Sequence, residues 1–167
     1  GYAPTSLAPD DCYQTGARAA DVNALHEALG GDENAVLIEH DWGASTAYIA
    51  ACNANQRWRR VVAMSVPPIL TFRKALVGNL AQIKSSWYMF YFQSALAEIA
   101  VPANDYALIE SLWKEWSPDF ESKYDLENFK KCVSSPNNLK AALGYYRASL
   151  GNGKKMDAYN ALETKGL

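Results

Sequence analysis

Hydrophobic residues in the first part of the chain follow helix and strand patterns in alternation. Apolar side chains recur at helical spacing over residues 22–29, which predicts an amphipathic helix that ends at Gly30-Gly31. The continuous apolar run 35–38 is typical of a strand buried on both faces of a parallel sheet. Small residues at 44–51 predict a second helix, and the run 60–66 predicts a second buried strand. This order favours a right-handed βαβ unit.

The strand patterns disappear after Pro67-Pro68. Short helical segments follow, and aromatic residues gather between Trp87 and Trp116. The sequence therefore predicts an α/β fold class, with about two parallel strands and their helices in residues 1–68 and an all-helical lobe in residues 69–167.

Composition and charge narrow the classes of function. The chain has 167 residues, of which 49% are hydrophobic and 20% charged, and such a chain can bury a core. The net charge of −2, with both signs mixed along the sequence, gives no support to a nucleic-acid partner. No apolar run approaches the roughly 18 residues that span a bilayer, so we expect no membrane partner.

The cysteines and the start of the chain bear on its location. Cys12, Cys52 and Cys132 are odd in number and far apart, which fits neither a disulfide framework nor a metal site. We expect reduced thiols and a cytoplasmic location. Residues 1–6 show no secretory signal, and the missing initiator Met suggests that the chain begins inside a longer reading frame.

The tetrapeptide His40-Asp41-Trp42-Gly43 lies where the first predicted strand turns into a helix. A sharp strand-to-helix turn with a reactive side chain at its apex is the geometry of a nucleophile elbow, and small residues at 43–45 allow the close approach of strand and helix. A carboxylate at the apex can attack the carbon of an epoxide or alkyl halide and form an ester. Alternatively, Asp41 only caps the following helix, a position where aspartate is favoured.

Five segments together are similar to one known group of enzymes. Residues 36–44 resemble the elbow of epoxide hydrolases and haloalkane dehalogenases in the α/β-hydrolase superfamily. Residues 1–6 resemble the loop after the fourth strand of that fold, and residues 66–68 resemble the exit of the sixth strand into the cap. Residues 88–93 and 135–148 resemble the two cap segments that carry substrate-facing tyrosines in epoxide hydrolases. The resemblance implies a partial α/β-hydrolase core followed by a helical cap.

The resemblance also implies roles for individual residues. Asp41 would be the nucleophile, and Tyr88 and Tyr146 would hold the epoxide oxygen, which needs hydrogen-bond donors as its negative charge develops. The Trp42 N–H would stabilise the oxyanion of ester hydrolysis, and Trp42 and Phe92 would bind substrate. The product would be a diol formed through an aspartyl ester, and this route implies no organic cofactor and no metal.

Several features depart from the family pattern. Glu39 stands where the usual elbow has glycine, so we expect its side chain to crowd the turn or to swing aside. The stretch between Gln93 and Ala97 is one residue shorter than expected. Nothing resembles the His-Gly-x-Pro loop that gives the second oxyanion N–H, nor the strands that carry the acid and the histidine base. The chain has only His26 and His40, and neither matches that base.

These absences predict that the chain is a fragment covering the elbow and the cap. Its partners would be a small apolar epoxide and the missing part of its own fold, or further copies in a homo-oligomer. Two alternatives stay open. A haloalkane or haloacid dehalogenase would use the same nucleophile, although paired tyrosines favour an epoxide because a halide leaves without a proton. A truncated, non-catalytic module would serve only binding or oligomerisation.

Overall fold

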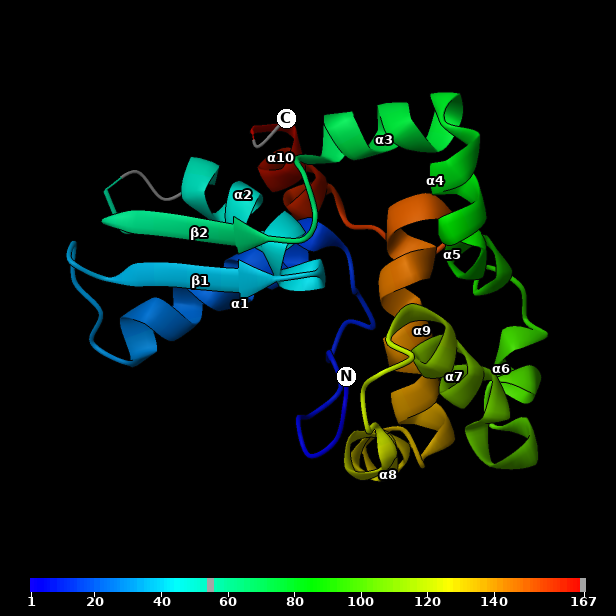
Figure 1. Cartoon of the computed structure of the whole chain (residues 1–167). Coiled ribbons are helices and arrows are strands. Elements are labelled where there is room, and N and C mark those ends of the chain that lie inside the picture. Colours follow the sequence, from blue (N-terminus) through cyan, green and yellow to red (C-terminus); the bar gives the residue numbers. More distant parts are fainter. Residues whose placement is uncertain (54–55, 166–167) are drawn as a thin grey trace.

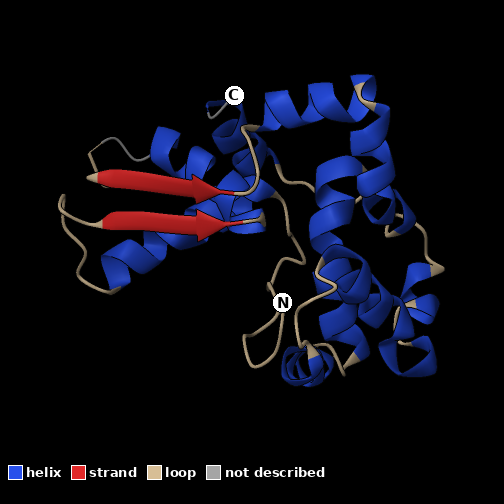
Figure 2. Cartoon of the chain, viewed as in Figure 1, coloured by secondary structure: helices blue, strands red, loops and turns tan. Residues whose placement is uncertain are grey.

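A two-stranded parallel sheet organises the first lobe of the molecule. The computed structural model describes residues 1–53 and 56–165. Strands β1 (Val36–His40) and β2 (Arg60–Met64) pair in parallel, with Val36 opposite Arg60 and His40 opposite Met64. Figure 1 shows both strands directed toward a second lobe, and Figure 2 shows that helices make up the regular structure of that lobe. The predicted α/β fold class, a partial core followed by helices, is confirmed.

One face of the sheet is covered by helix. Helix α2 (Trp42–Asn53) packs on both strands, and helix α1 (Thr15–Ala28) packs on α2. Ala19, Leu37, Ala47, Ile49 and Ala50 form the core between these elements. The prediction that the strands are buried on both faces is wrong for this chain, because Val36 is 50% and Ile38 63% exposed. Leu37, which points to the α2 side, is 8% exposed.

Helix α1 ends where the glycines predict but buries a different side. Gly30 has a φ of 70°, the left-handed conformation that follows many helices. Leu25 and Leu29, two members of the predicted apolar stripe, are 58% and 82% exposed. The buried residues are instead Gly16, Ala17 and Ala19, because α1 meets its neighbours through small side chains that allow close approach.

The last helix, α10 (Asp157–Lys165), returns to the first lobe and packs on α1 and α2. Buried Gln14 accepts a hydrogen bond from the Met156 N–H at 2.7 Å and donates one to Asn160 Oδ1 at 3.0 Å. Part of the range 69–167, predicted as cap, therefore lies beside the core; residues 166–167 are outside the described residues.

The second lobe is built around helix α9 (Pro136–Leu150), which begins at a proline as the Ser135-Pro136 pair predicts. Seven buried residues form its core: Phe92, Ala97, Val101, Val133, Leu139, Ala142 and Leu143. Of the other helices of this lobe, α5 (Trp87–Tyr91) and α6 (Ala97–Ala100) pack on α9. The rest are α3 (Ile69–Gly78), α4 (Leu80–Ser85), α7 (Ala103–Trp116) and α8 (Lys123–Cys132). Among the described residues, no helix has both the length and the apolar character needed to cross a membrane.

The lobes meet where the parallel strands end. The carboxyl ends of β1 and β2 face α9 and the helices around it (Figure 1). Ligands of open α/β sheets bind at this edge, since side chains that follow several strands converge there. The fold therefore directs attention to the residues after His40 and after Met64.

Candidate active site

Asp41 forms the apex of a tight turn between β1 and α2. Its φ is 55°, a left-handed conformation that costs a non-glycine residue energy and is concentrated at functional sites. The Asp41 N–H donates to the Met64 carbonyl at 3.3 Å, and the Ala44 N–H donates to the Asp41 carbonyl at 3.0 Å. An ordinary helix N-cap has extended backbone angles, so the left-handed backbone favours the elbow over the simple cap.

The carbonyl oxygen of Trp42 fixes the turn from the other side. It accepts hydrogen bonds from Arg18 Nη1 at 2.8 Å, Ser45 Oγ at 2.8 Å and Thr46 Oγ1 at 3.0 Å. Burial lowers the pKa of Arg18 to about 10, which still leaves the guanidinium charged at neutral pH. The sequence analysis did not identify Arg18. The one feature that could have indicated it is its position as a cation among the small residues of α1.

The Trp42 N–H points at the carboxylate of Asp41 and donates to Asp41 Oδ1 at 2.7 Å. If Oδ2 attacked a carbon, Oδ1 would become the ester carbonyl oxygen and later the oxyanion. The Trp42 N–H is thus positioned at the atom where negative charge would develop.

Glu39 is accommodated by the glycine that follows the elbow. A Cβ at position 43 would collide with the Glu39 carboxylate, so the side chain lies in the space that Gly43 leaves open. Glu39 lines a shallow second hollow with Arg18, Gly43 and Tyr145. The predicted crowding is relieved because Gly43 has no side chain.

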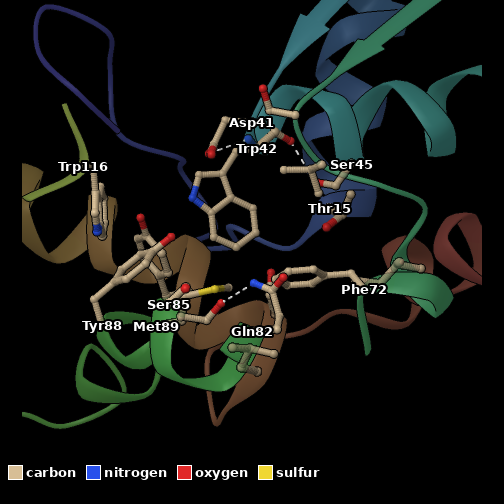
Figure 3. A pocket seen from close by; sticks show the side chains of 17 residues that line it. Thr15, Asp41, Trp42, Ser45, Phe72, Gln82, Ser85, Tyr88, Met89 and Trp116 are labelled. Atoms are coloured by element: carbon tan, nitrogen blue, oxygen red, sulfur yellow. Dashed lines mark hydrogen bonds between the residues drawn. The ribbon is translucent and has the colours of Figure 1, made fainter. Parts of the chain in front are cut away.

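A cavity of about 430 Å³ opens between the elbow and the helices of the second lobe. Figure 3 shows the Trp42 ring in the middle of the view with Asp41 above it, Tyr88 and Trp116 on one side and Thr15 and Phe72 on the other. Its lining residues are Thr15, Asp41, Trp42, Ser45, Ser65, Val66, Ile69, Phe72, Gln82, Ser85, Ser86, Tyr88, Met89, Trp116, Tyr146, Ser149 and Leu150. The predicted residues Asp41, Trp42, Tyr88 and Tyr146 therefore share one cavity.

The two tyrosines pack against each other and against the elbow. The Tyr88 and Tyr146 rings meet edge to face with centroids 5.8 Å apart, and Tyr146 meets the Trp42 ring at 5.0 Å. Burial raises the pKa of Tyr146, and Tyr88 and Tyr2 raise it further. Burial, together with the charge of Asp41, also raises the pKa of Tyr88. Both phenols therefore keep their protons at neutral pH and remain hydrogen-bond donors.

Phe92 and the histidines lie outside the cavity lining. Phe92, predicted from the sequence to bind substrate, is 5% exposed and packs behind the tyrosines, with its ring 4.9 Å from Tyr146 and 5.8 Å from Tyr88. The structure places it as a support for these rings. His26 packs edge-on against Trp58, and His40 is exposed, so neither histidine reaches the cavity.

The polar residues of the cavity were missed by sequence reasoning. Thr15, Gln82 and Ser149 come from α1, α4 and α9, which are far apart in the chain. No motif in the sequence distinguishes these three residues from other polar residues on helices. Only the packing of the two lobes shows that they line the same cavity.

No protein-family model matches the chain. A curated protein named epoxide hydrolase 1, from Caenorhabditis elegans, is 28% identical over 164 residues, which cover 94% of this chain and 40% of that protein. Epoxide hydrolase 3 from Mus musculus is 28% identical over 152 residues, covering 88% of this chain and 41% of that protein. The chain thus spans about 40% of the length of these relatives.

Solved structures show the same likeness. A putative epoxide hydrolase from Klebsiella pneumoniae superposes with a TM-score of 0.75 at 27% identity, over 98% of this chain and 54% of that one. The epoxide hydrolase of Bacillus megaterium gives a TM-score of 0.66 at 24% identity, over 87% of this chain and 50% of that one. The resemblance to epoxide hydrolases of the α/β-hydrolase fold is confirmed.

Proposed function

We propose that this chain supplies the nucleophile and the proton donors of an epoxide hydrolase, which opens an epoxide to a diol through an aspartyl ester. The observation that carries the proposal is the single cavity shared by Asp41, Tyr88 and Tyr146. The relatives named epoxide hydrolase support the same chemistry.

In the first half-reaction, an Asp41 carboxylate oxygen attacks one epoxide carbon as the bond from that carbon to the ring oxygen breaks. The ring oxygen takes a proton from Tyr88 or Tyr146, and the resulting phenolate is reprotonated by water. Because burial raises the pKa of both phenols, they hold these protons until the alkoxide forms. The Trp42 N–H keeps the other carboxylate oxygen in place.

The second half-reaction needs a base that activates water at the ester. Neither histidine of the chain lines the cavity, so residues outside this sequence would supply the base, its acid partner and a second oxyanion donor. These residues would belong to the missing part of the same fold, or to another copy in an oligomer. The three free cysteines are consistent with a cytoplasmic location.

The substrate would be a small epoxide with an apolar body. The cavity volume of about 430 Å³ fits a small molecule, and Val66, Ile69, Phe72 and Met89 give it apolar walls. Asp41 is the only ionised side chain among the lining residues, so a neutral substrate suits the site.

Intact-mass measurement after treatment with styrene oxide tests the proposal. Wild-type chain should gain one adduct with the full mass of the epoxide, because ring opening loses no atoms. Asp41→Asn should gain none, whereas Asp11→Asn, a change at another exposed aspartate with left-handed backbone, should react like wild type.

The other outcomes separate the alternatives. An adduct from a chloroalkane but none from styrene oxide would identify a dehalogenase. A well-folded wild type that gains no adduct from either reagent would favour a non-catalytic module, and an adduct that persists in Asp41→Asn would place the chemistry at another residue.

A further inference from the structure

The side of the cavity away from Tyr88 and Trp116 carries hydrogen-bond donors that the proposed reaction does not use. Figure 3 shows Thr15, Phe72 and Gln82 on this side, across the Trp42 ring from the tyrosine side. We propose that Thr15 and Gln82 bind a neutral carbonyl oxygen, so that the favoured substrates are epoxides bearing an ester, amide or ketone group. This inference deepens the proposed function and rests on it for the epoxide.

The hydroxyl of Thr15 is prepared to donate. Its Oγ1 accepts a hydrogen bond from Arg18 Nη2 at 2.9 Å, and it donates none to any of the described residues. A hydroxyl that accepts from a cation becomes a stronger donor, because hydrogen bonds in a chain polarise one another. Arg18 is itself held by the Trp42 carbonyl, so Thr15 Oγ1 has a fixed position at the cavity wall.

The amide of Gln82 provides a second donor. Gln82 Nε2 donates one of its two protons to Ser86 Oγ at 2.9 Å, which fixes the orientation of the amide group. Ser86 is only 3% exposed, so this bond is shielded from water. The second Nε2 proton makes no hydrogen bond with the described residues and remains for a ligand oxygen.

The charges around the cavity select a neutral acceptor over a carboxylate. Asp41 is the one ionised group among the lining residues, and it would repel an anionic ligand. The guanidinium of Arg18 donates to the Trp42 carbonyl and to Thr15 Oγ1, and the negative charges of Glu163, Asp41 and Glu39 act on it as well. A carbonyl oxygen needs donors but brings no net charge, and therefore suits Thr15 and Gln82.

A pair of epoxides that differ only at the carbonyl tests the inference. In glycidyl butyrate a carbonyl replaces one methylene of butyl glycidyl ether. Asp41→Asn should bind both without reacting, and quenching of Trp42 and Trp116, which line the cavity, reports binding. We expect glycidyl butyrate to bind about tenfold more tightly than the ether, the effect of one or two hydrogen bonds.

Variants test which residues cause the preference for glycidyl butyrate over the ether. In the Asp41→Asn background, Thr15→Val should reduce the preference to about twofold or less, while Thr15→Ser, which keeps the hydroxyl, should retain it. Gln82→Met should reduce it partly. Thr71→Val makes the same change at an exposed residue of α3 that does not line the cavity and should leave it unaltered.

Equal affinity for the two epoxides in Asp41→Asn, or a preference that survives both Thr15→Val and Gln82→Met, would overturn the carbonyl site. Failure of the proposed function would give a different result: neither epoxide would form an adduct on wild type that depends on Asp41.

Discussion

Arg18 and Trp42 are joined twice: Arg18 Nη1 donates to the Trp42 carbonyl at 2.8 Å, and the guanidinium lies 5.1 Å from the centre of the indole ring. The guanidinium also lies 5.2 Å from the ring of Tyr145, the neighbour of Tyr146 on α9, and this ring is 6.2 Å from that of Trp42. One cation thus connects the elbow that carries Asp41 with the helix that carries the second tyrosine. Loss of this contact should disturb the spacing of Asp41 and Tyr146, the proposed nucleophile and proton donor.

Arg18→Met should therefore slow alkylation of Asp41 by about tenfold and lower the free energy of unfolding by about 2 kcal/mol, since a charge-assisted hydrogen bond contributes about that much. Intact-mass time courses and urea unfolding give the two quantities. Arg73→Met, at an exposed arginine of α3, is the control and should change neither. An unchanged alkylation rate in a destabilised Arg18→Met would restrict Arg18 to a structural role.

The two cavity tyrosines should both contribute to adduct formation. Tyr146→Phe and Tyr88→Phe should each slow adduct formation by about tenfold to a hundredfold, because one donor to the developing alkoxide is lost. The double variant should lose more than either single variant. Tyr124→Phe, at a tyrosine that is 74% exposed, should react at the wild-type rate. Rates that do not differ among these variants would assign the proton to water.

The raised pKa values of Tyr88 and Tyr146 predict how stability depends on pH. Burial favours the protonated phenol in the folded state. An unfolded tyrosine has a pKa of about 10, and below that pH the protonated phenols make their full contribution to the free energy of unfolding. This contribution is lost as pH rises through the higher folded-state values. The free energy of unfolding should thus fall above about pH 10, and it should fall less steeply in Tyr146→Phe. Identical slopes would contradict the assignment.

Glu39 and Gly43 should be coupled. Gly43→Ala should destabilise the chain by about 1 kcal/mol, because the added Cβ displaces the Glu39 carboxylate and presses on the Glu39 Cβ. In a Glu39→Gly background the same change should cost much less, since the nearest atoms to that Cβ all belong to Glu39. Denaturant unfolding of the four proteins measures the coupling free energy directly. If the two free-energy changes simply add, a contact other than that with Glu39 causes the loss of stability in Gly43→Ala.

Gln14 should govern the docking of α10. Gln14→Leu removes the acceptor of the Met156 N–H and the donor to Asn160, which should lower the free energy of unfolding by about 1–3 kcal/mol. Amide hydrogen exchange should quicken in α10 before it quickens in α2. Equal loss of protection in both helices would mean that α10 and the sheet unfold as one unit.

Local sequence patterns predicted those parts of the fold that depend on neighbouring residues. The strands at 36–40 and 60–64, the glycine end of α1 and the turn at Asp41 each follow from a short segment. The shared cavity of Asp41, Tyr88 and Tyr146 was anticipated through the resemblance of three motifs, since spacing in the chain does not fix distances between helices.

The unpredicted features all depend on contacts between distant segments. The buried side of α1 is set by α2 and α10, which it meets through Gly16, Ala17 and Ala19 rather than through Leu25. Thr15 and Gln82 are 67 positions apart (82 − 15) and meet one cavity only because the second lobe closes over the elbow. The hydrophobic pattern of a single segment does not predict which distant segments it will contact.

Each strand of the sheet has a neighbour on one side only within the described residues. On the outer side, backbone amides and carbonyls form an open template, next to apolar side chains such as Val36, Ile38 and Val62. Such a template accepts whatever extended backbone reaches it first. Each open edge can therefore pair with an extended segment of another polypeptide, and pairing with a second copy of this chain would start aggregation.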